Sequence, residues 1–116
     1  MAKTLRFKKE DLIDYTVKFM EKLGVPASDA EIVGDVLIEA DLRGVSSHGL
    51  IRLSSYYGNR LKKGYMDPVT RTTTVNETDT TLAFDGGNGL GQVNSYRAMT
   101  ACIEKAKKSN IAVATV

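Results

Sequence analysis

The sequence predicts an α/β chain in which three helices precede the start of a mixed sheet, in the order α-α-α-β-β-α-β. Three observations predict this class. Apolar residues recur every three to four positions through most of residues 7–64, which is the period of helices with one buried face. Between Pro68 and Gly86 the composition changes to β-branched residues, which favour strands. A further helical pattern then leads into the apolar run IAVATV, which is typical of a strand.

Length and composition describe one ordinary domain. The 116 residues are enough to bury one core, and no linker, repeat or low-complexity tract divides them. We therefore treat 1–116 as a single segment, helical over 7–64 and α/β over 68–116. Sixteen basic and fourteen acidic residues leave a net charge of +2 without a basic run. This distribution gives no reason to expect nucleic acid or a membrane as a partner.

The cysteine count and the amino-terminal stretch bear on the compartment. The single cysteine, Cys102, excludes an internal disulfide and is expected to be a small buried thiol, so a cytoplasmic location is predicted. The stretch MAKTLRFKKED carries charge without a following apolar region. No stretch approaches the roughly 18 apolar residues of a membrane span. We expect no targeting segment, no membrane segment and no metal ion.

Two amphipathic helices are expected first. The helix over residues 8–23 has one apolar face and ends at Gly24, before Val25-Pro26; the face is Leu12, Ile13, Thr16/Val17, Met20 and Leu23. Ser28 and Glu31 match a capping box, so a second helix is expected to begin at Ser28 and to end at Gly44. Its apolar positions predict packing against the first helix as an antiparallel pair; they are Ile32/Val33, Val36/Leu37 and Ala40.

A third helix is expected after Gly44, with Ser46 or Ser47 as its N-cap and Gly64 at its end. Residues 68–86 predict two antiparallel strands around a polar turn at 76–79. A fourth helix is expected over residues 92–108; its apolar face is Val93, Tyr96, Met99/Thr100, Ile103 and Ala106. The last six residues are expected to form a buried strand. Because such a strand requires neighbours on both sides, we expect the chain to be part of a larger fold.

The only histidine, His48, would lie in the first turn of the third helix. Unpaired N–H groups and the positive end of the helix dipole would favour a neutral ring there. Arg52 lies four residues later and would project from the same helical face. Arginine binds a carboxylate through two parallel hydrogen bonds, and a neighbouring imidazole exchanges a proton with a carbonyl or hydroxyl. Ser47 would orient the ring. On spacing alone, a surface or capping histidine and a solvated arginine are the preferred interpretation of the pattern.

Two other features have structural explanations. The segment Gly86–Gly91 lacks the Gly-x-Gly-x-x-Gly spacing of a Rossmann phosphate loop, so a non-Rossmann fold is predicted. We expect Asn88 and the glycines to adopt positive φ in a turn from strand to helix, with Gln92 in the first helical turn. Tyr56 and Tyr57 are expected to pack the third helix rather than to act in catalysis.

The run ADLRGVSSHGLIRL resembles the signature of the malate/L-lactate dehydrogenase family, which is distinct from the Rossmann-type dehydrogenases. The pattern Ala-Asp-x-Arg-Gly-x-x-Ser-His-Gly-x-x-Arg is met by Ala40, Asp41, Arg43, Gly44, Ser47, His48, Gly49 and Arg52. The segment LAFDGGNGLGQ resembles the Gly-rich segment that follows in the family, and the helical opening and final strand resemble the family in order. The resemblance therefore covers the whole chain.

This resemblance implies an oxidoreductase that interconverts small 2-hydroxy and 2-oxo acids with NAD or NADP. Members act on malate, lactate, sulfolactate and ureidoglycolate, and others reduce diketogulonate or a cyclic imino acid. Residue by residue, it implies that His48 donates a proton to the substrate carbonyl or imine, assisted by Ser47, and that Arg52 holds the carboxylate. It also implies a homodimer. No cofactor-binding residue is assigned.

The chain departs from the family in length. Members continue into a second His-containing segment, most of the dinucleotide contacts and a lysine-bearing region. In some members the later histidine transfers the proton, so it and His48 stay as alternatives. We expect residues 1–116 to be an amino-terminal portion that is inactive alone. Two other functions stay open, a non-catalytic interaction module and a small anion-binding domain. The sequence chooses neither the acid nor NAD over NADP.

Overall fold

The structure is a computed structural model that describes residues 5–116. The first residues of the charged amino-terminal stretch, where we expect no targeting signal, lie outside the described residues. The chain divides into two compact units, residues 1–59 and 60–116, and each is described by itself. Within the described residues no helix has the length and apolar character needed to cross a membrane. That part of the chain also contains no cluster of three or more side chains suited to a metal ion.

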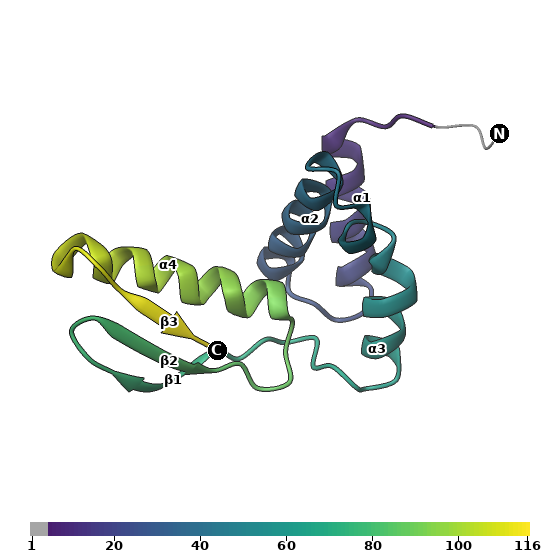
Figure 1. Ribbon diagram of the computed structural model, residues 1–116. Helices are drawn as coiled ribbons and strands as arrows, with labels where there is room; N and C mark the ends of the chain where they lie inside the picture. Colours follow the sequence, from purple (N-terminus) through teal and green to yellow (C-terminus); the bar gives the residue numbers. More distant parts are fainter. Residues whose placement is uncertain (1–4) are drawn as a thin grey trace. The chain divides into compact units, whose positions relative to one another are not determined.

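The first unit is built on two packed antiparallel helices, α1 (Lys9–Glu21) and α2 (Ala27–Leu42) (Figure 1). Their pairing confirms the expected helix pair. The core between them is formed by buried side chains of both helices and is dominated by Met20, Ala30, Val33, Leu37 and Ile38. Gly34 allows the helices to approach closely, because a Cβ there would lie 3.3 Å from Ile13 Cγ2.

The boundaries of this pair agree with the sequence at three of four ends. Gly24 and Gly44 follow the two helices with φ of +88° and +78°, as the stop signals predict. The predicted capping box at Ser28 does not form, so that prediction is wrong. The carbonyl of Pro26 already accepts the Ala30 N–H at 2.9 Å, so the helical hydrogen bonds begin earlier and Ser28 lies inside the first turn.

The prediction that Val36 of α2 packs against α1 is also wrong. Val36 is 42% exposed, whereas Ile38 is buried. The buried side chains follow a stripe that passes through Gly34, the point of closest approach to α1. Val36 lies about 200° around the helix from Gly34 and therefore faces solvent.

The third helix is not one regular helix. Ser46–His48 form a single 3-10 turn (η1), a tight turn follows, and the chain then runs through a π-helical segment η2 (Leu53–Gly58) into α3 (Asn59–Lys62). Neither Ser46 nor Ser47 caps it with its side chain, so the predicted N-cap is wrong. Gly64, at φ +70°, follows the helix as expected.

The π-helical segment contains a close contact that accounts for its glycine. A Cβ on Gly58 would lie 2.9 Å from Phe19 Cζ and 3.3 Å from the carbonyl oxygen of Leu53. The absence of a side chain at Gly58 therefore lets the Phe19 ring of α1 pack directly on the backbone of η2.

The second unit is a three-stranded mixed sheet with one long helix. Strands β1 (Thr73–Glu77) and β2 (Thr81–Asp85) form the predicted antiparallel hairpin, with a bulge at Val75. Helix α4 (Gly91–Ser109) connects β2 to β3 (Val113–Thr115), which pairs parallel with β2. The sheet order is β1-β2-β3, which confirms the predicted mixed sheet (Figure 1).

Of the face expected for α4, Val93 is buried as predicted, whereas the middle of that face is exposed. The buried residues of α4 are Val93, Asn94 and Ala98, and its exposed apolar residues are Tyr96, Met99 and Ile103. The final strand is not buried either, because β3 has a neighbour on one side only. Its exposed residues include Val113. Cys102 is half-buried rather than fully buried.

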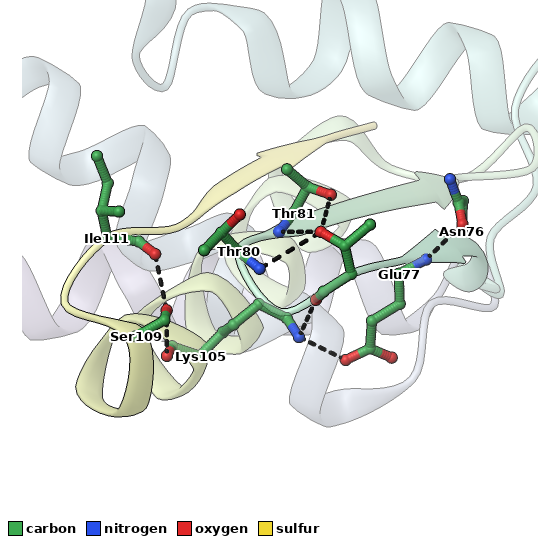
Figure 2. Close-up of polar contacts among 8 residues, drawn as sticks. Asn76, Glu77, Thr80, Thr81, Lys105, Ser109 and Ile111 are labelled. Atoms are coloured by element: carbon green, nitrogen blue, oxygen red, sulfur yellow. Dashed lines mark hydrogen bonds and ion pairs between the residues drawn. The ribbon is translucent and has the colours of Figure 1, made fainter.

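Polar contacts tie α4 to the hairpin at both of its ends. At the carboxyl-terminal half, Lys105 Nζ donates to Glu77 Oε1 and to the carbonyl of Thr78, each at 2.7 Å (Figure 2). The Thr78 hydroxyl in turn accepts the N–H of Thr81 at 3.0 Å. Figure 2 also shows Ser109, whose hydroxyl lies 3.0 Å from the Lys105 carbonyl and 2.8 Å from that of Ile111.

At the amino-terminal half, Asn94 forms the corresponding link. Its side chain is buried, donates to the Gly86 carbonyl at 3.0 Å and accepts from the Thr72 hydroxyl at 2.6 Å. An amide with both functions satisfied in this way holds the start of α4 against the end of β2 and the segment before β1.

We predict that Asn94→Ala destabilises the second unit by about 2–4 kcal/mol, because two groups at the site lose their partner. Ser95→Ala, at an exposed position of the same helix, is the matched control and should change stability by less than about 0.5 kcal/mol. Urea denaturation followed through the amide signals of α4 measures both. Equal effects of the two substitutions would contradict the assignment.

Candidate active site

The loop that carries His48 is fixed by main-chain hydrogen bonds to the end of α2. Beyond the reversal at Gly44, the Gly44 N–H donates to the carbonyl of Asp41 at 3.0 Å. The Val45 N–H donates to the carbonyl of Ala40 at 2.9 Å. The His48 N–H then donates to the carbonyl of Val45 at 3.0 Å, which closes the 3-10 turn. The backbone of the loop is thus determined locally, within one unit.

The cap that the sequence places on Ser46 or Ser47 is supplied instead by Asp41. Its Oδ2 accepts the Leu50 N–H at 2.8 Å, across nine residues. A carboxylate satisfies an otherwise unpaired N–H before a helical segment and favours the positive end of its dipole. His48 ends the 3-10 turn and does not lie in the first turn of a regular helix.

Ser47 and His48 are in direct contact. The Ser47 hydroxyl oxygen lies 2.9 Å from His48 Nδ1, as expected for a serine that orients the ring. When Nδ1–H donates to the hydroxyl oxygen, Nε2 is the nitrogen that accepts or releases a proton. His48 itself is exposed.

Arg52 is held by the same residue through its main chain. Arg52 Nε donates to the Ser47 carbonyl at 2.8 Å, and its guanidinium carbon lies 5.6 Å from the centre of the Tyr56 ring. Among the described residues, the two terminal nitrogens of Arg52 have no hydrogen-bond acceptor. They remain available to a carboxylate, which two parallel N–H donors match in geometry.

The structure brings these side chains to one depression of about 200 Å³, lined by His48, Arg52, Tyr56 and Tyr57. The route differs from the expected one. His48 ends a 3-10 turn and does not share a regular helical face with Arg52, so a turn rather than helical periodicity joins them. Ser47 does not line the depression, but its hydroxyl contacts His48 Nδ1.

Sequence reasoning did not place the two tyrosines in the site. Their rings meet edge to face, with centroids 5.0 Å apart and an interplanar angle of 83°. Tyr56 lies four residues after Arg52, and that spacing on a helix was the available signal. Asp41 was part of the motif, but its contact with Leu50 depends on the loop and has no sequence period.

The depression has the chemistry of a site for a small carboxylic acid. It offers a fixed cation with two available donors, an imidazole with a defined neighbour, and two aromatic rings. Its volume is below the roughly 300–1,000 Å³ typical of pockets that enclose larger ligands. It therefore fits a small acid and does not fit a dinucleotide.

The glycine-rich turn does not fit a dinucleotide either. Three of its amides are used internally: Gly87 N–H donates to Asp85 Oδ1 at 2.7 Å, Leu90 N–H to the Thr70 hydroxyl at 3.0 Å and Gly89 N–H to the Gly86 carbonyl at 3.3 Å. A phosphate cradle requires free amides and no neighbouring carboxylate. Gln92 enters the first turn of α4 as expected, and its Oε1 is buried without a partner among the described residues.

Asn88 corrects the expectation for this turn. Of the residues between Gly86 and Gly91, Gly87 has a positive φ, of +56°, and Asn88 does not. The Asn88 side chain instead donates to the Tyr65 carbonyl at 2.9 Å. Gly89 is required for space, because a Cβ there would lie 2.8 Å from Thr70 Cγ2. We assign cofactor binding to none of the described residues.

Comparison with known proteins agrees with this fold. A family model described as malate/L-lactate dehydrogenase matches residues 7–116. Malate dehydrogenase of Pyrococcus abyssi is 42% identical over 97% of this chain, and L-sulfolactate dehydrogenase of Methanocaldococcus jannaschii is 40% identical over 84%. The solved structure of malate dehydrogenase from Pyrococcus horikoshii superposes with a TM-score of 0.91 at 40% identity over 95% of this chain.

The match covers a limited share of each relative. This chain spans 31% of the Pyrococcus abyssi protein, 28% of the Methanocaldococcus jannaschii protein and 31% of the Pyrococcus horikoshii structure. The agreement extends over almost the whole of this chain, in sequence and in fold. The chain belongs to the malate/L-lactate dehydrogenase family.

Proposed function

We propose that this chain supplies the carboxylate-binding and proton-handling residues of an oxidoreductase that interconverts a small 2-hydroxy acid, such as malate or lactate, with its 2-oxo acid. One observation carries the proposal: Ser47 holds His48 through its hydroxyl and Arg52 through its carbonyl, and both side chains line one depression. The family and its relatives, dehydrogenases of hydroxy acids, support the reaction class.

Arg52 acts as the carboxylate anchor. Because its Nε is occupied by the Ser47 carbonyl, the substrate carboxylate meets the two terminal nitrogens end-on. Contact with the Tyr56 ring limits the swing of the guanidinium and reduces the conformational entropy lost on binding. The fixed carboxylate in turn places the neighbouring carbonyl beside the imidazole.

His48 handles the proton. A nicotinamide cofactor, NAD or NADP, supplies or takes the hydride when bound. Reduction of a carbonyl leaves negative charge on its oxygen, and a protonated His48 gives its Nε2 proton to that oxygen and becomes a neutral ring. In the oxidative direction the same nitrogen accepts the hydroxyl proton. The Ser47 hydroxyl oxygen accepts from Nδ1–H in both directions, so Nε2 is the nitrogen that exchanges the proton.

The complete activity requires more polypeptide than these 116 residues. The chain spans about 30% of its relatives, and His48 and most of the loop are exposed. Proton and hydride transfer need a site shielded from water, so further surface must cover the depression. We therefore propose a longer cytoplasmic enzyme that works as a homodimer, with these residues inactive alone. The single cysteine is compatible with a reducing compartment.

Arg52→Ala in the full enzyme is predicted to lower kcat/KM for the acid by about 2–4 kcal/mol, roughly 30- to 1,000-fold. Arg52→Lys should restore little of this loss, because a point charge does not reproduce two parallel donors. Steady-state assays of reduced nicotinamide with oxaloacetate, pyruvate and sulfopyruvate measure the effect. Arg43→Ala is the control, since Arg43 pairs with Glu39 outside the depression. Similar losses in both variants would count against the anchor.

His48→Ala is predicted to reduce kcat by about 10²- to 10⁴-fold while the affinity for the cofactor stays near that of the wild type. Ser47→Ala should cause a smaller loss, because the ring loses its orientation but keeps its chemistry. Single-turnover reduction of the oxo acid, followed with pH, separates the two effects. Retention of wild-type kcat in His48→Ala would assign proton transfer to a residue elsewhere in the enzyme.

The full enzyme is predicted to be a dimer in solution. Exposed apolar side chains in the described chain support an interface, among them Tyr96, Met99 and Ile103 on α4. Light scattering at micromolar concentration should give twice the monomer mass. A monomer that keeps full activity would disprove the homodimer and leave the proposal for the active site intact.

A further inference from the structure

We propose that Asp41 is a positioning residue for the active site, which holds the His48 loop in place without touching substrate. The proposal rests on the proposed function of His48 and Arg52. Asp41 lies in the last turn of α2, and it holds both ends of the loop. Its main-chain carbonyl accepts the Gly44 N–H at 3.0 Å, and its carboxylate accepts the Leu50 N–H at 2.8 Å.

The two contacts enclose the residues that form the site. Between Gly44 and Leu50 the chain contains Ser47 and His48. A shift of Leu50 moves the start of the helical segment that carries Arg52, whereas a shift of the loop moves the imidazole. Because Ser47 binds both side chains, either movement changes their separation. The carboxylate of Asp41 therefore sets the distance between proton donor and carboxylate anchor.

The position of the Asp41 carboxylate also requires a glycine at position 49. A Cβ on Gly49 would lie 2.2 Å from Asp41 Cγ and from Oδ1, and 2.4 Å from Oδ2. The carboxylate thus occupies the space of a side chain at position 49. The φ of Gly49 is −91°, outside the left-handed region, and the carboxylate leaves no room for a Cβ at this position. Gly49 is buried, and Asp41 is partly buried.

Among the described residues, no ion pair explains the position of the Asp41 carboxylate. Arg43, two residues away, donates to Glu39 Oε1 at 2.9 Å. In the described part of the chain, Asp41 has no salt bridge, and its side-chain hydrogen bond goes to Leu50. A lone acceptor that costs desolvation and caps one amide is consistent with a role in geometry.

The geometry leads to a coupled set of variants in the full enzyme. Asp41→Ala should lower kcat by about 10- to 100-fold, since small misplacements of reacting groups have effects of this size. Asp41→Asn keeps an oxygen acceptor and should stay within about threefold of wild type. Gly49→Ala should resemble Asp41→Ala. The double variant should lose no more than the worse single variant, because removal of the carboxylate opens the space.

A spectroscopic measurement keeps this proposal separate from the proposed function. His48 is the only histidine in the 116-residue chain, so its imidazole nitrogen signals are assigned without ambiguity. In this chain, Asp41→Ala and Gly49→Ala should shift the Nδ1 signal toward that of Ser47→Ala, while the amide signals of α1 stay in place. Asp41→Asn should keep the wild-type signal. Loss of the α1 signals in Asp41→Ala would leave the Asn and Gly49 variants to decide.

The possible outcomes are distinct. Wild-type kcat and imidazole signals in both Asp41→Ala and Gly49→Ala would overturn the positioning role. Strictly additive losses in the double variant would also overturn it. Shifted imidazole signals together with an active His48→Ala enzyme would support the role of Asp41 in the loop and refute the proposed function of His48.

Discussion

The peptide group and side chain of Ser47 are the constraint on which the candidate site depends. Its carbonyl fixes Arg52 Nε and its hydroxyl meets His48 Nδ1. The side chains of His48 and Arg52, which differ in chemistry, are thus both hydrogen-bonded to Ser47. Such an arrangement lowers the number of independent rotations that must be lost when an acid binds. The hydrogen bonds of Gly44 and of the Asp41 carboxylate fix the backbone on either side of Ser47.

The regular elements of the fold were predictable because each is governed by a local rule. The apolar periods of α1, α2 and α4 and the β-branched hairpin follow from sequence spacing, and glycines mark the helix ends at 24, 44 and 64. Choices among equivalent faces were not predictable. Helix α4 has two apolar stripes, and the period is the same for both. Only the sheet determines that Val93 and Ala98 are buried while Met99 is exposed.

The site was predictable in its residues and not in its geometry. Ser47, His48 and Arg52 follow from the motif, and the serine–histidine contact was expected. A regular helix was the wrong scaffold, because the first N–H groups are satisfied by Asp41 and by tight turns rather than by a serine cap. A contact between residues nine positions apart, such as that of Asp41 with Leu50, is not visible in the three-to-four-residue spacing of a helix. Tyr57 was assigned to packing because a regular third helix would have to bury one face, yet it lines the depression.

The two edges of the sheet differ in what they present to other strands. At the β1 edge the ladder is interrupted by the bulge at Val75, and the Glu77 N–H is bonded to Asn76 Oδ1 (Figure 2). These features discourage a further strand. At the other edge, β3 exposes apolar Val113 and carries no charged side chain. Among the described strands, β3 is therefore the edge at which the sheet accepts a further strand, and β1 is the edge that discourages one.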